Sequence, residues 1–420
     1  MAYFVVITYN TDEEDTPPII RKGRTALKAI VGSAVETISS GRLERGTILV
    51  ENEKIIAVGD NIPLPPEAHI IDGSGMTTTP GLIDAHTHIG ACPEGMPYSM
   101  TDENDMTDPA TPQLRILDSI YPFDPAFEEA REGGVTTLQV LPGSANVIGG
   151  QGAVIKTVGS VVDAMTVAAP SGMKAALGEN PIGVYKKRDQ LPTTRMGNAA
   201  IMRNSLYQAI NYKANKIHHE NKKDDDKEPF EIKPDMEAML PVLEGAMPLR
   251  VHCHRADDIA TAIRTAEEFG IHLTLEHCTE GHLIAEYLAS KKVMAAVGPT
   301  LSTRPKIELR HMTWNTLKVF ADRGIHFCII TDHPVIPVQA LILCATMAHK
   351  AGLRRDQALR AITLSGAEHL GLEGRLGSIE PGKDADLVLW DGDPLDARTH
   401  VSMTLIDGKI VYRNADTFLR

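Results

Sequence analysis

The feature that most constrains the fold of this chain is a regular alternation of strand-like and helix-like segments through its middle. A helix-type segment begins at Asp124 and ends at Gly133, and residues 135–143 follow it as a near-continuous apolar run, typical of a strand buried on both faces. Strands that recur with one helix between them imply parallel pairing. From residue 82 onward about eight such strands can be placed, which predicts an α/β fold of the closed (β/α)8 type, a TIM barrel. The clearest later strands lie at 248–254, 271–278, 293–300 and 325–334.

Two parts of this central region have a weaker pattern. The third and fourth strands of the series are expected within 153–158 (AVIKTV) and 173–179 (MKAALGE). Residues 215–234 are dense in charge and lack periodicity. That composition favours a solvated loop or insertion between barrel elements, and a mobile flap near the active site is the alternative.

Segments with a β pattern flank the central region on both sides. Residues 46–59 contain two β-branched runs around a turn, as a hairpin would. Residues 376–394 and 404–413 are short runs separated by Pro-Gly and Asp-Gly turns. The economical arrangement pairs the two ends of the chain with each other in a small β-sandwich domain. We therefore expect residues 1–78 and 372–420 to form that domain and residues 79–371 to form the barrel.

Composition argues against several classes of function. The net charge of −13 disfavours nucleic acid or an anionic membrane as a partner, because both attract basic surfaces. The five cysteines are odd in number and include no CxxC pair, which fits a reducing compartment. The N-terminal segment lacks the features of a signal peptide, and no stretch reaches the roughly 20 apolar residues of a transmembrane helix. We expect a cytoplasmic homo-oligomer that acts on a small-molecule substrate, with no nucleic-acid or membrane partner.

Histidine pairs with one intervening residue occur at 86–88 and at 252–254. In a strand, residues i and i+2 point to one face, so the first pair can chelate one ion. His252, His277 and Asp332 each fall near the C-terminal end of a separate predicted strand, where catalytic groups gather in a barrel. A lone histidine is more often a satisfied core residue, but several imidazoles and a carboxylate at matching strand ends suit Zn²⁺, Fe²⁺ or Mn²⁺.

Four short motifs carry these residues: PGLIDAHTH (80–88), VHCH (251–254), LEHC (275–278) and TDHP (331–334). With the flanking segments GTILVENEKIIAVG (46–59) and GSIEPGKDADLVLWDGDP (377–394), they resemble the metal-dependent amidohydrolase superfamily, and within it the imidazolonepropionase-related amidohydrolases. His254 departs from imidazolonepropionase itself, where an acidic residue is usual, so that particular activity is not implied. The resemblance implies that Asp332 and His277 are catalytic and that the metal ligands are His86, His88, His252, His277 and Asp332.

A further metal ligand is expected from the third or fourth strand. Two-metal members of the superfamily hold both ions with a bridging Glu or carboxylated Lys from that region, and this chain offers Lys156, Lys174 and Glu179. We prefer Glu179, which sits at the C-terminal edge of the fourth strand, over Lys174, which lies deeper in it. The expected cofactor is one or two divalent ions, with Zn favoured over Fe or Mn.

The expected reaction is hydrolysis of a carbon–nitrogen bond. A bound metal lowers the pKa of its water from 15.7 to roughly 7 and polarises the substrate carbonyl, so that activated hydroxide attacks. Asp332 is expected to take the water proton and pass it to the leaving amine as general base and acid. No Glu follows His252 closely, which favours an amide, lactam or dipeptide-type substrate over deamination of a ring amine. His254 and Arg255 are candidates to bind a substrate carboxylate.

Three other interpretations stay open from the sequence alone. The chain could be a ring-amine deaminase, a phosphotriester or carboxylic-ester hydrolase, or a catalytically inactive scaffold of the same architecture. The glycine-rich segment 142–152 is interpreted as a loop on the substrate side of the barrel, although it lacks the frame of a phosphate-binding loop.

Overall fold

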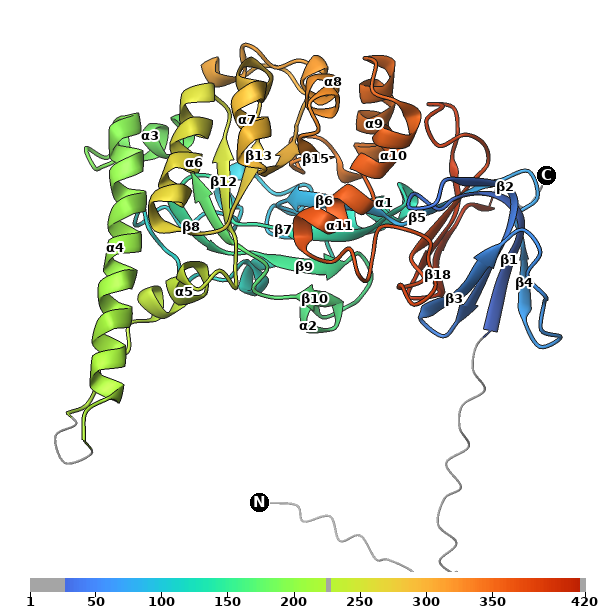
Figure 1. Ribbon diagram of the computed structural model, residues 1–420, viewed down its shortest axis with the longest axis horizontal. Coiled ribbons are helices and arrows are strands. Elements are labelled where there is room, and N and C mark those ends of the chain that lie inside the picture. The colour runs from blue at the N-terminus through green and yellow to red at the C-terminus, as the bar shows by residue number, and fades with distance from the viewer. Residues whose placement is uncertain (1–26, 224–227, 416–420) are drawn as a thin grey trace, which may run out of the picture.

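The computed structural model describes residues 27–223 and 228–415 (Figure 1). The expectations for the first 26 residues, including the absence of a signal peptide, and for residues 224–227 of the charge-dense run lie outside the described residues. Across the described ranges, no helix combines the length and the apolar character needed to cross a membrane.

The two ends of the chain form one eight-stranded sheet, which lies at the right of Figure 1. Strand β16, near the C-terminus, pairs antiparallel with β5, just before the central region, and this ladder joins the two ends. The hairpin expected at 46–59 is confirmed as the antiparallel pair β2 and β3. The strands of this sheet are β1 (Leu27–Glu36), β2 (Arg42–Glu51), β3 (Lys54–Gly59), β4 (His69–Asp72), β5 (Thr77–Pro80), β16 (Leu387–Trp390), β17 (Val401–Ile406) and β18 (Lys409–Arg413).

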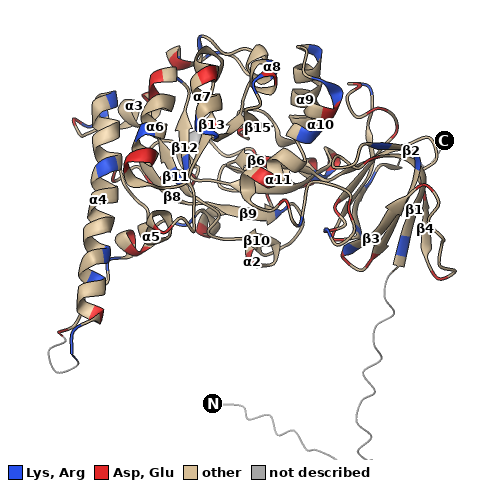
Figure 2. Cartoon of the chain, viewed as in Figure 1, with Lys and Arg blue, Asp and Glu red and all other residues tan. Residues whose placement is uncertain are grey.

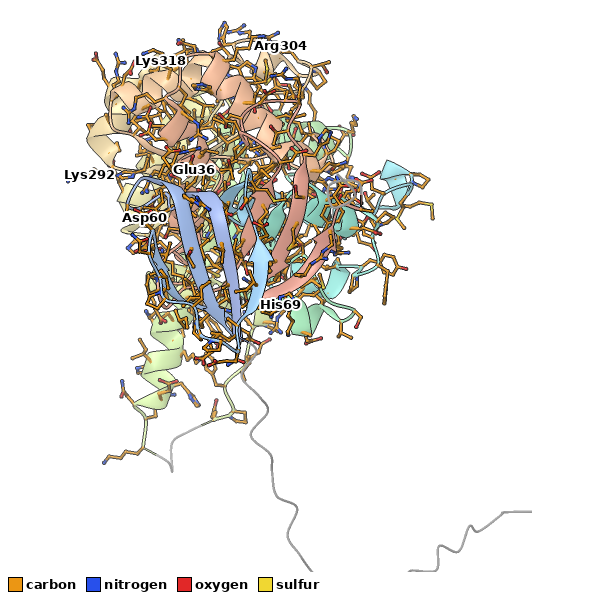
Figure 3. All side chains as sticks on the ribbon, turned by 90° about the vertical axis from the view of Figure 1, so that its right-hand side faces the viewer. Glu36, Asp60, His69, Lys292, Arg304 and Lys318 are labelled. Atoms are coloured by element: carbon orange, nitrogen blue, oxygen red, sulfur yellow. The ribbon has the colours of Figure 1, made fainter. Side chains whose placement is uncertain are left out.

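Apolar side chains on one face of this terminal sheet form a core of their own. Ile30, Ile48, Leu389 and Met403 are fully buried in it. Figure 3 shows Glu36 at the end of the sheet nearest the helices, where its carboxylate accepts a hydrogen bond from Nη1 of Arg355 at 2.6 Å. The terminal sheet is therefore held together by burial and linked to the central region by ion pairs.

The central region holds a six-stranded sheet whose main strands run parallel in chain order, as the alternating pattern predicts. Helices α6 (Ala256–Phe269), α7 (Ala285–Lys291) and α8 (Asn315–Asp322) connect its last four strands. The sequence sets these helices clearly: α6 has acidic residues in its first turn and ends at Gly270, which has the left-handed backbone that glycine favours. The strands are β8 (Ile148–Gln151), β11 (Met173–Ala176), β12 (Leu249–Cys253), β13 (Leu273–His277), β14 (Met294–Val297) and β15 (His326–Ile329).

A second central sheet contains β6 (Leu82–Thr87), β7 (Val135–Val140), β9 (Ala153–Lys156) and β10 (Thr166–Ala168). Only β6 and β7 pair parallel, whereas β9 runs antiparallel to β7 and β10 antiparallel to β9. Strand β8 is likewise antiparallel to β11. The expectation of parallel pairing is therefore wrong in this part. No crossover helix separates β7 from β9, and a parallel return needs a connection of about a dozen residues or more, usually a helix.

Backbone hydrogen bonds bridge both gaps between the two central sheets. On one side, the segment after β15 pairs with β6, because His88 N donates to His333 O at 2.8 Å and Asp332 N donates to His86 O at 3.2 Å. On the other side, Gly152 N donates to Gly172 O and Ser171 N donates to Gly152 O, both at 2.9 Å. The mixed sheets thus adjoin at both edges.

Most of the helices lie outside the strands, as Figure 1 shows for α6 to α10. Lys, Arg, Asp and Glu are frequent on these outer helices and loops (Figure 2). The helices are α1 (Ala126–Glu132), α2 (Val162–Met165), α3 (Glu179–Lys186), α4 (Arg195–Glu220), α5 (Pro234–Leu243), α6 (Ala256–Phe269), α7 (Ala285–Lys291), α8 (Asn315–Asp322), α9 (Leu341–Lys350), α10 (Arg355–Ala361) and α11 (Leu364–Leu370). Short 3-10 turns are Tyr98–Met100, Ile116–Ser119, Gly281–Ile284, Ile307–Leu309 and Val338–Ala340.

The expectation of a loop for residues 215–234 is wrong at its start. Residues 215–220 are the last turns of the 26-residue helix α4, which projects from the body of the protein in Figure 1. Lys216 bonds Glu237 of α5 through both carboxylate oxygens, at 2.6 and 2.9 Å. Contacts between the two helices therefore extend the helix into a segment whose own sequence shows no apolar periodicity.

Candidate metal centre

The predicted ligand residues gather at one edge of the central strands. His86 lies near the end of β6, His277 is the last residue of β13, and Asp332 follows β15. His277 and Asp332 have positive φ angles of 72° and 57°. Left-handed backbone is uncommon at non-glycine residues, although Asp and His adopt it more readily than most. Both residues contribute to one cluster of close ligand atoms with His86.

In five imidazoles of this region, Nδ1 forms a hydrogen bond with a neighbouring residue. A carbonyl or carboxylate at Nδ1 fixes the Nδ1–H tautomer and leaves Nε2 as an acceptor, whereas a hydroxyl can pair with either tautomer. His86 is held by a carboxylate, His88 and His277 by backbone carbonyls, and the other two by hydroxyls. The Nδ1 contacts are His86 with Glu276 Oε2 at 2.9 Å, His88 with Leu141 O at 2.8 Å, His252 with Ser144 Oγ at 2.9 Å, His254 with Thr279 Oγ1 at 2.8 Å and His277 with Gly298 O at 2.9 Å.

The Nε2 atoms of His86 and His88 lie next to Asp332. Oδ1 of Asp332 lies 3.5 Å from Nε2 of His86 and 3.4 Å from Nε2 of His88. One ligand atom each from His86, His277 and Asp332 lies within 4.8 Å of the others, and so does one each from His252, His254 and His277.

Two of these ring nitrogens have no hydrogen-bond partner. Within the described part of the chain, Nε2 of His252 and Nε2 of His277 are buried and unpaired. A buried, unsatisfied acceptor costs about 1–3 kcal/mol unless something binds it. The donor set, mostly neutral imidazole with one carboxylate, is the set that Zn²⁺ and similar divalent ions take. The residues present therefore fit a metal ion.

Burial keeps the imidazoles neutral. Burial, together with the positive charge of Lys174, lowers the pKa of His86 to about 3. Burial also lowers the pKa of His252, His254 and His277. Neutral imidazole is the form that binds a metal, so these four rings need no deprotonation near neutral pH.

Asp332 and Lys174 are the charged groups at the centre. Burial alone would raise the pKa of Asp332, but His277 and His88 interact with its carboxylate and hold the pKa well below its usual range. Burial lowers the pKa of Lys174 to about 8, although Asp332 acts in the opposite direction. Asp332 is therefore a carboxylate over the whole physiological range.

The candidates for a further ligand differ in position. Lys174, on β11, places Nζ 3.4 Å from Nε2 of His86 and donates to Pro142 O at 3.1 Å. Glu179 begins α3, is half-buried, and belongs to neither cluster of close ligand atoms. Lys156 pairs with Asp386 at 2.5 Å instead. The sequence marked Lys174 as the alternative, and the structure brings it, not Glu179, to the histidines.

A polar group lies beside the centre, on the side of His254. Nζ of Lys306 is 3.4 Å from Nε2 of His254 and 3.0 Å from Oδ1 of Asn180. Lys306 also pairs with the buried Glu308 at 3.1 Å. Sequence reasoning missed Lys306, which lies in the irregular segment after β14. Arg255, which sequence reasoning selected, directs both arms of its guanidinium to Asp257, each at 2.9 Å.

The glycine-rich segment 142–152 lies next to the centre, as its position after the second strand predicts. The hydroxyl of Ser144 is hydrogen-bonded to Nδ1 of His252, and the carbonyl of Pro142 accepts a hydrogen bond from Nζ of Lys174. Part of the segment is the short strand β8 rather than loop.

Comparison with known proteins places this geometry in a family. Residues 234–411 match the Amidohydrolase family. The crystal structure of an amidohydrolase from Thermotoga maritima MSB8 is 43% identical, covers 92% of this chain and 100% of its own, and superposes with a TM-score of 0.89. The chain belongs to the amidohydrolase family. It is a hydrolase acting on carbon–nitrogen bonds, and the resemblance drawn from the four motifs is confirmed.

Other amidohydrolase relatives differ in length. Amidohydrolase tasK of Hapsidospora irregularis is 31% identical over 86% of this chain, but the chain spans only 39% of that protein. The imidazolonepropionase of Alkaliphilus metalliredigens (strain QYMF) is 23% identical over 88% of this chain and 90% of its own length.

Proposed function

We propose that this amidohydrolase is a metal-dependent hydrolase of amide, lactam or dipeptide-type bonds. The observation that carries the proposal is a cluster of five buried imidazoles, each with Nδ1 in a hydrogen bond. Nε2 of His86 and of His88 lies within 3.5 Å of Asp332, and Nε2 of His252 and of His277 is unpaired among the described residues. Buried polar atoms are normally hydrogen-bonded, so two unpaired ring nitrogens in one cluster indicate a binding site rather than packing alone.

We propose that residues 79–371 form the (β/α)8 barrel that carries the centre, with residues 1–78 and 372–420 as the flanking β domain. The backbone hydrogen bonds on both sides of the two central sheets support closure, although β9 and β10 pair antiparallel. The edge at which His86, His252 and His277 meet is then the C-terminal face of the barrel, where active sites of this fold lie.

We assign the metal ligands to His86, His88, His252, His277 and Asp332, and we place Lys174 ahead of Glu179 as the further ligand. Lys174 is preferred because its Nζ lies beside the His86 ring, whereas the Glu179 amide donates to Glu308 Oε2 at 3.0 Å at the start of a helix. The bound ion, Zn or alternatively Fe or Mn, supplies a Lewis acid and lowers the pKa of a water.

Asp332 is the residue that moves protons. Its carboxylate stays ionised because His277, His88 and His86 stabilise the charge, so it can accept a proton from water. The same carboxylate then returns the proton to the leaving nitrogen. The ring of His277 lies beside it, with Nδ1 4.0 Å from Oδ2 of Asp332. Proton transfer of this kind contributes about 10²–10⁴-fold to rate.

His254 and Lys306 lie on the side of the centre where we place the substrate. The side chain of Lys306 is 28% exposed and its ammonium lies next to the buried His254 ring, so it can receive an anionic group of the substrate. A substrate with a carboxylate near its scissile bond, as in a dipeptide or an N-acyl amino acid, matches this arrangement.

The test combines metal analysis with turnover. Purified protein should hold a divalent ion, lose activity on chelation and regain it with Zn²⁺, when assayed on dipeptides, N-acyl amino acids and lactams. Asp332→Asn should lower kcat by at least about 10²-fold, while the exposed control Asp322→Asn should not. Absence of bound metal after metal-supplemented expression, or full activity of Asp332→Asn, would contradict the proposal.

A further inference from the structure

A charged group lies buried directly behind the candidate metal centre. Glu276, Arg250 and His369 are 0%, 1% and 3% exposed, and they come from β13, β12 and α11. Barrel interiors are normally filled by branched apolar side chains. Burying a carboxylate is costly unless it is paired and fully hydrogen-bonded, so this group calls for an explanation beyond packing.

The two carboxylate oxygens of Glu276 accept hydrogen bonds from different residues. Its Oε2 accepts a hydrogen bond from Nδ1 of His86 at 2.9 Å. Its Oε1 accepts from Oγ1 of Thr274 at 2.8 Å and from Nε2 of His369 at 3.0 Å. Arg250 adds a positive charge 3.9 Å away. The donors on Oε1 therefore hold the carboxylate so that the other oxygen stays aimed at His86.

Arg250 is itself fixed in place by backbone acceptors. Its guanidinium donates to the carbonyls of Ser171 and His369, at 3.1 to 3.3 Å. It therefore neutralises the charge of Glu276 without occupying the oxygen that His86 needs. The positive charge allows the carboxylate to remain ionised in a site that excludes water.

His86 differs in this respect from the other four histidines of the centre. Their Nδ1 atoms meet carbonyls or hydroxyls, whereas Nδ1 of His86 meets a carboxylate. A carboxylate fixes the Nδ1–H tautomer and also makes the opposite nitrogen a stronger donor to a metal.

We propose that Glu276, held by His369, Thr274 and Arg250, is a positioning residue that orients His86 and strengthens its Nε2 as a metal ligand. The proposal rests on the metal centre proposed above. It assigns a function to four residues outside the ligand set, and it predicts that metal affinity depends on a side chain of α11 that does not touch the metal.

The experiment measures metal affinity by competition with a chelator on the full chain, with Zn²⁺ as the probe. Glu276→Gln should bind Zn²⁺ about 10- to 100-fold more weakly than the wild type. The Co²⁺-substituted variant should also have an altered visible absorption spectrum, because the orientation of one ligand changes. The matched control is Glu368→Gln, since Glu368 lines the same cavity of about 760 Å³ as Arg250 and His369 but bonds Arg360.

A second pair of variants keeps the proposal testable if Glu276→Gln does not fold. His369→Leu removes the donor to Oε1 and should weaken Zn²⁺ binding, whereas His369→Gln, which offers an N–H at a similar position, should restore it. Wild-type Zn²⁺ affinity and Co²⁺ spectrum in folded Glu276→Gln, or equal affinities in the two His369 variants, would overturn this inference alone. A wild-type chain that binds no metal would overturn the proposed function instead.

Discussion

Nζ of Lys174 lies 3.4 Å from Nε2 of His86, and both side chains are fully buried. The ammonium has the Pro142 carbonyl as its other close acceptor, at 3.1 Å. A lysine placed against a neutral imidazole in the core gains little from that contact alone, since burial opposes its charge. Its position is explained if the amine is carboxylated and serves as a metal ligand between the histidines.

Lys174→Met tests this explanation, because methionine keeps the length of the side chain and removes the amine. We expect the metal content per chain to fall and kcat to drop by at least about 10²-fold through the loss of a ligand that orients the ion. Metal analysis and intact mass in non-denaturing conditions, where a carboxylated lysine adds the mass of CO₂, measure the effect. The exposed control Lys318→Met (Figure 3) should change neither quantity, and unaltered metal content in Lys174→Met would count against a ligand role.

Gly298→Ala should disturb the centre through the backbone. A Cβ at this position would lie 2.2 Å from the carbonyl oxygen of Ile330, and the carbonyl of Gly298 itself holds Nδ1 of His277. Relief of the clash must move one strand end, so we expect a loss of about 1–3 kcal/mol in the free energy of unfolding together with weaker Zn²⁺ binding. Gly374→Ala, whose Cβ would meet nothing within 4 Å, is the control for thermal unfolding. Equal unfolding curves for Gly298→Ala and Gly374→Ala would contradict this expectation, because they would show that the backbone accommodates the new Cβ without loss of stability.

The sequence predicted those parts of the fold in which local pattern and tertiary pairing agree. Strands β12 to β15 and their helices follow from apolar runs and helix-ending residues such as Gly270, and the terminal hairpin follows from its turn. Strand β9, expected within 153–158, was misjudged in direction, and β10 was not predicted at all. Their pairing depends on the lack of a crossover helix after β7, and apolar content alone does not report strand direction.

Some residues of the candidate site could likewise be predicted from the sequence, and others could not. Histidines at strand ends could be predicted because strand position fixes where the side chains lie. The choice between Lys174 and Glu179 could not, because it depends on Gly178, whose φ of 92° turns the chain after β11 so that Glu179 starts a helix. Lys306 lies in an irregular segment with no periodic signal, and only the folded chain brings it to His254.

Lys306→Met tests the substrate side of the site. Loss of a charge-assisted contact of about 1.5–3 kcal/mol should raise KM for a substrate that carries a carboxylate by about 10- to 100-fold. The value of kcat should change much less, because Lys306 is placed to bind and not to react. Steady-state kinetics on an N-acyl amino acid and on its uncharged amide separate the effects, with the distant Lys292→Met as control. An equal rise in KM for both substrates would contradict recognition of the carboxylate.

Lys156→Met should destabilise the junction between the central strands and the terminal segment. Lys156 is 5% exposed and pairs with Asp386 at 2.5 Å and Asp384 at 3.4 Å, both also buried. Removing one partner of a buried ion pair leaves an uncompensated charge, so we expect a loss of about 3–5 kcal/mol in the free energy of unfolding. Denaturant titration measures it. The control Lys54→Met also removes a partner of Asp384, but Lys54 is 48% exposed, so its loss should be about 0–1 kcal/mol.

The difference in the free energy of unfolding between the wild type and Lys156→Met should depend on pH, and the pKa values of Asp384 and Lys156 determine how. Burial would raise the pKa of Asp384, but Lys54 and Lys156 lower it from 3.8, so the stabilisation is present above pH 3.8 and is lost as pH falls through the lowered pKa. The pKa of Lys156 is raised above 10.5, because Asp386 and Asp407 outweigh its burial, so the stabilisation persists below pH 10.5 and is lost as pH rises further. The difference between wild type and Lys156→Met should therefore be constant near neutral pH and shrink in acid. A difference that grows on acidification would show that the pair does not stabilise the junction.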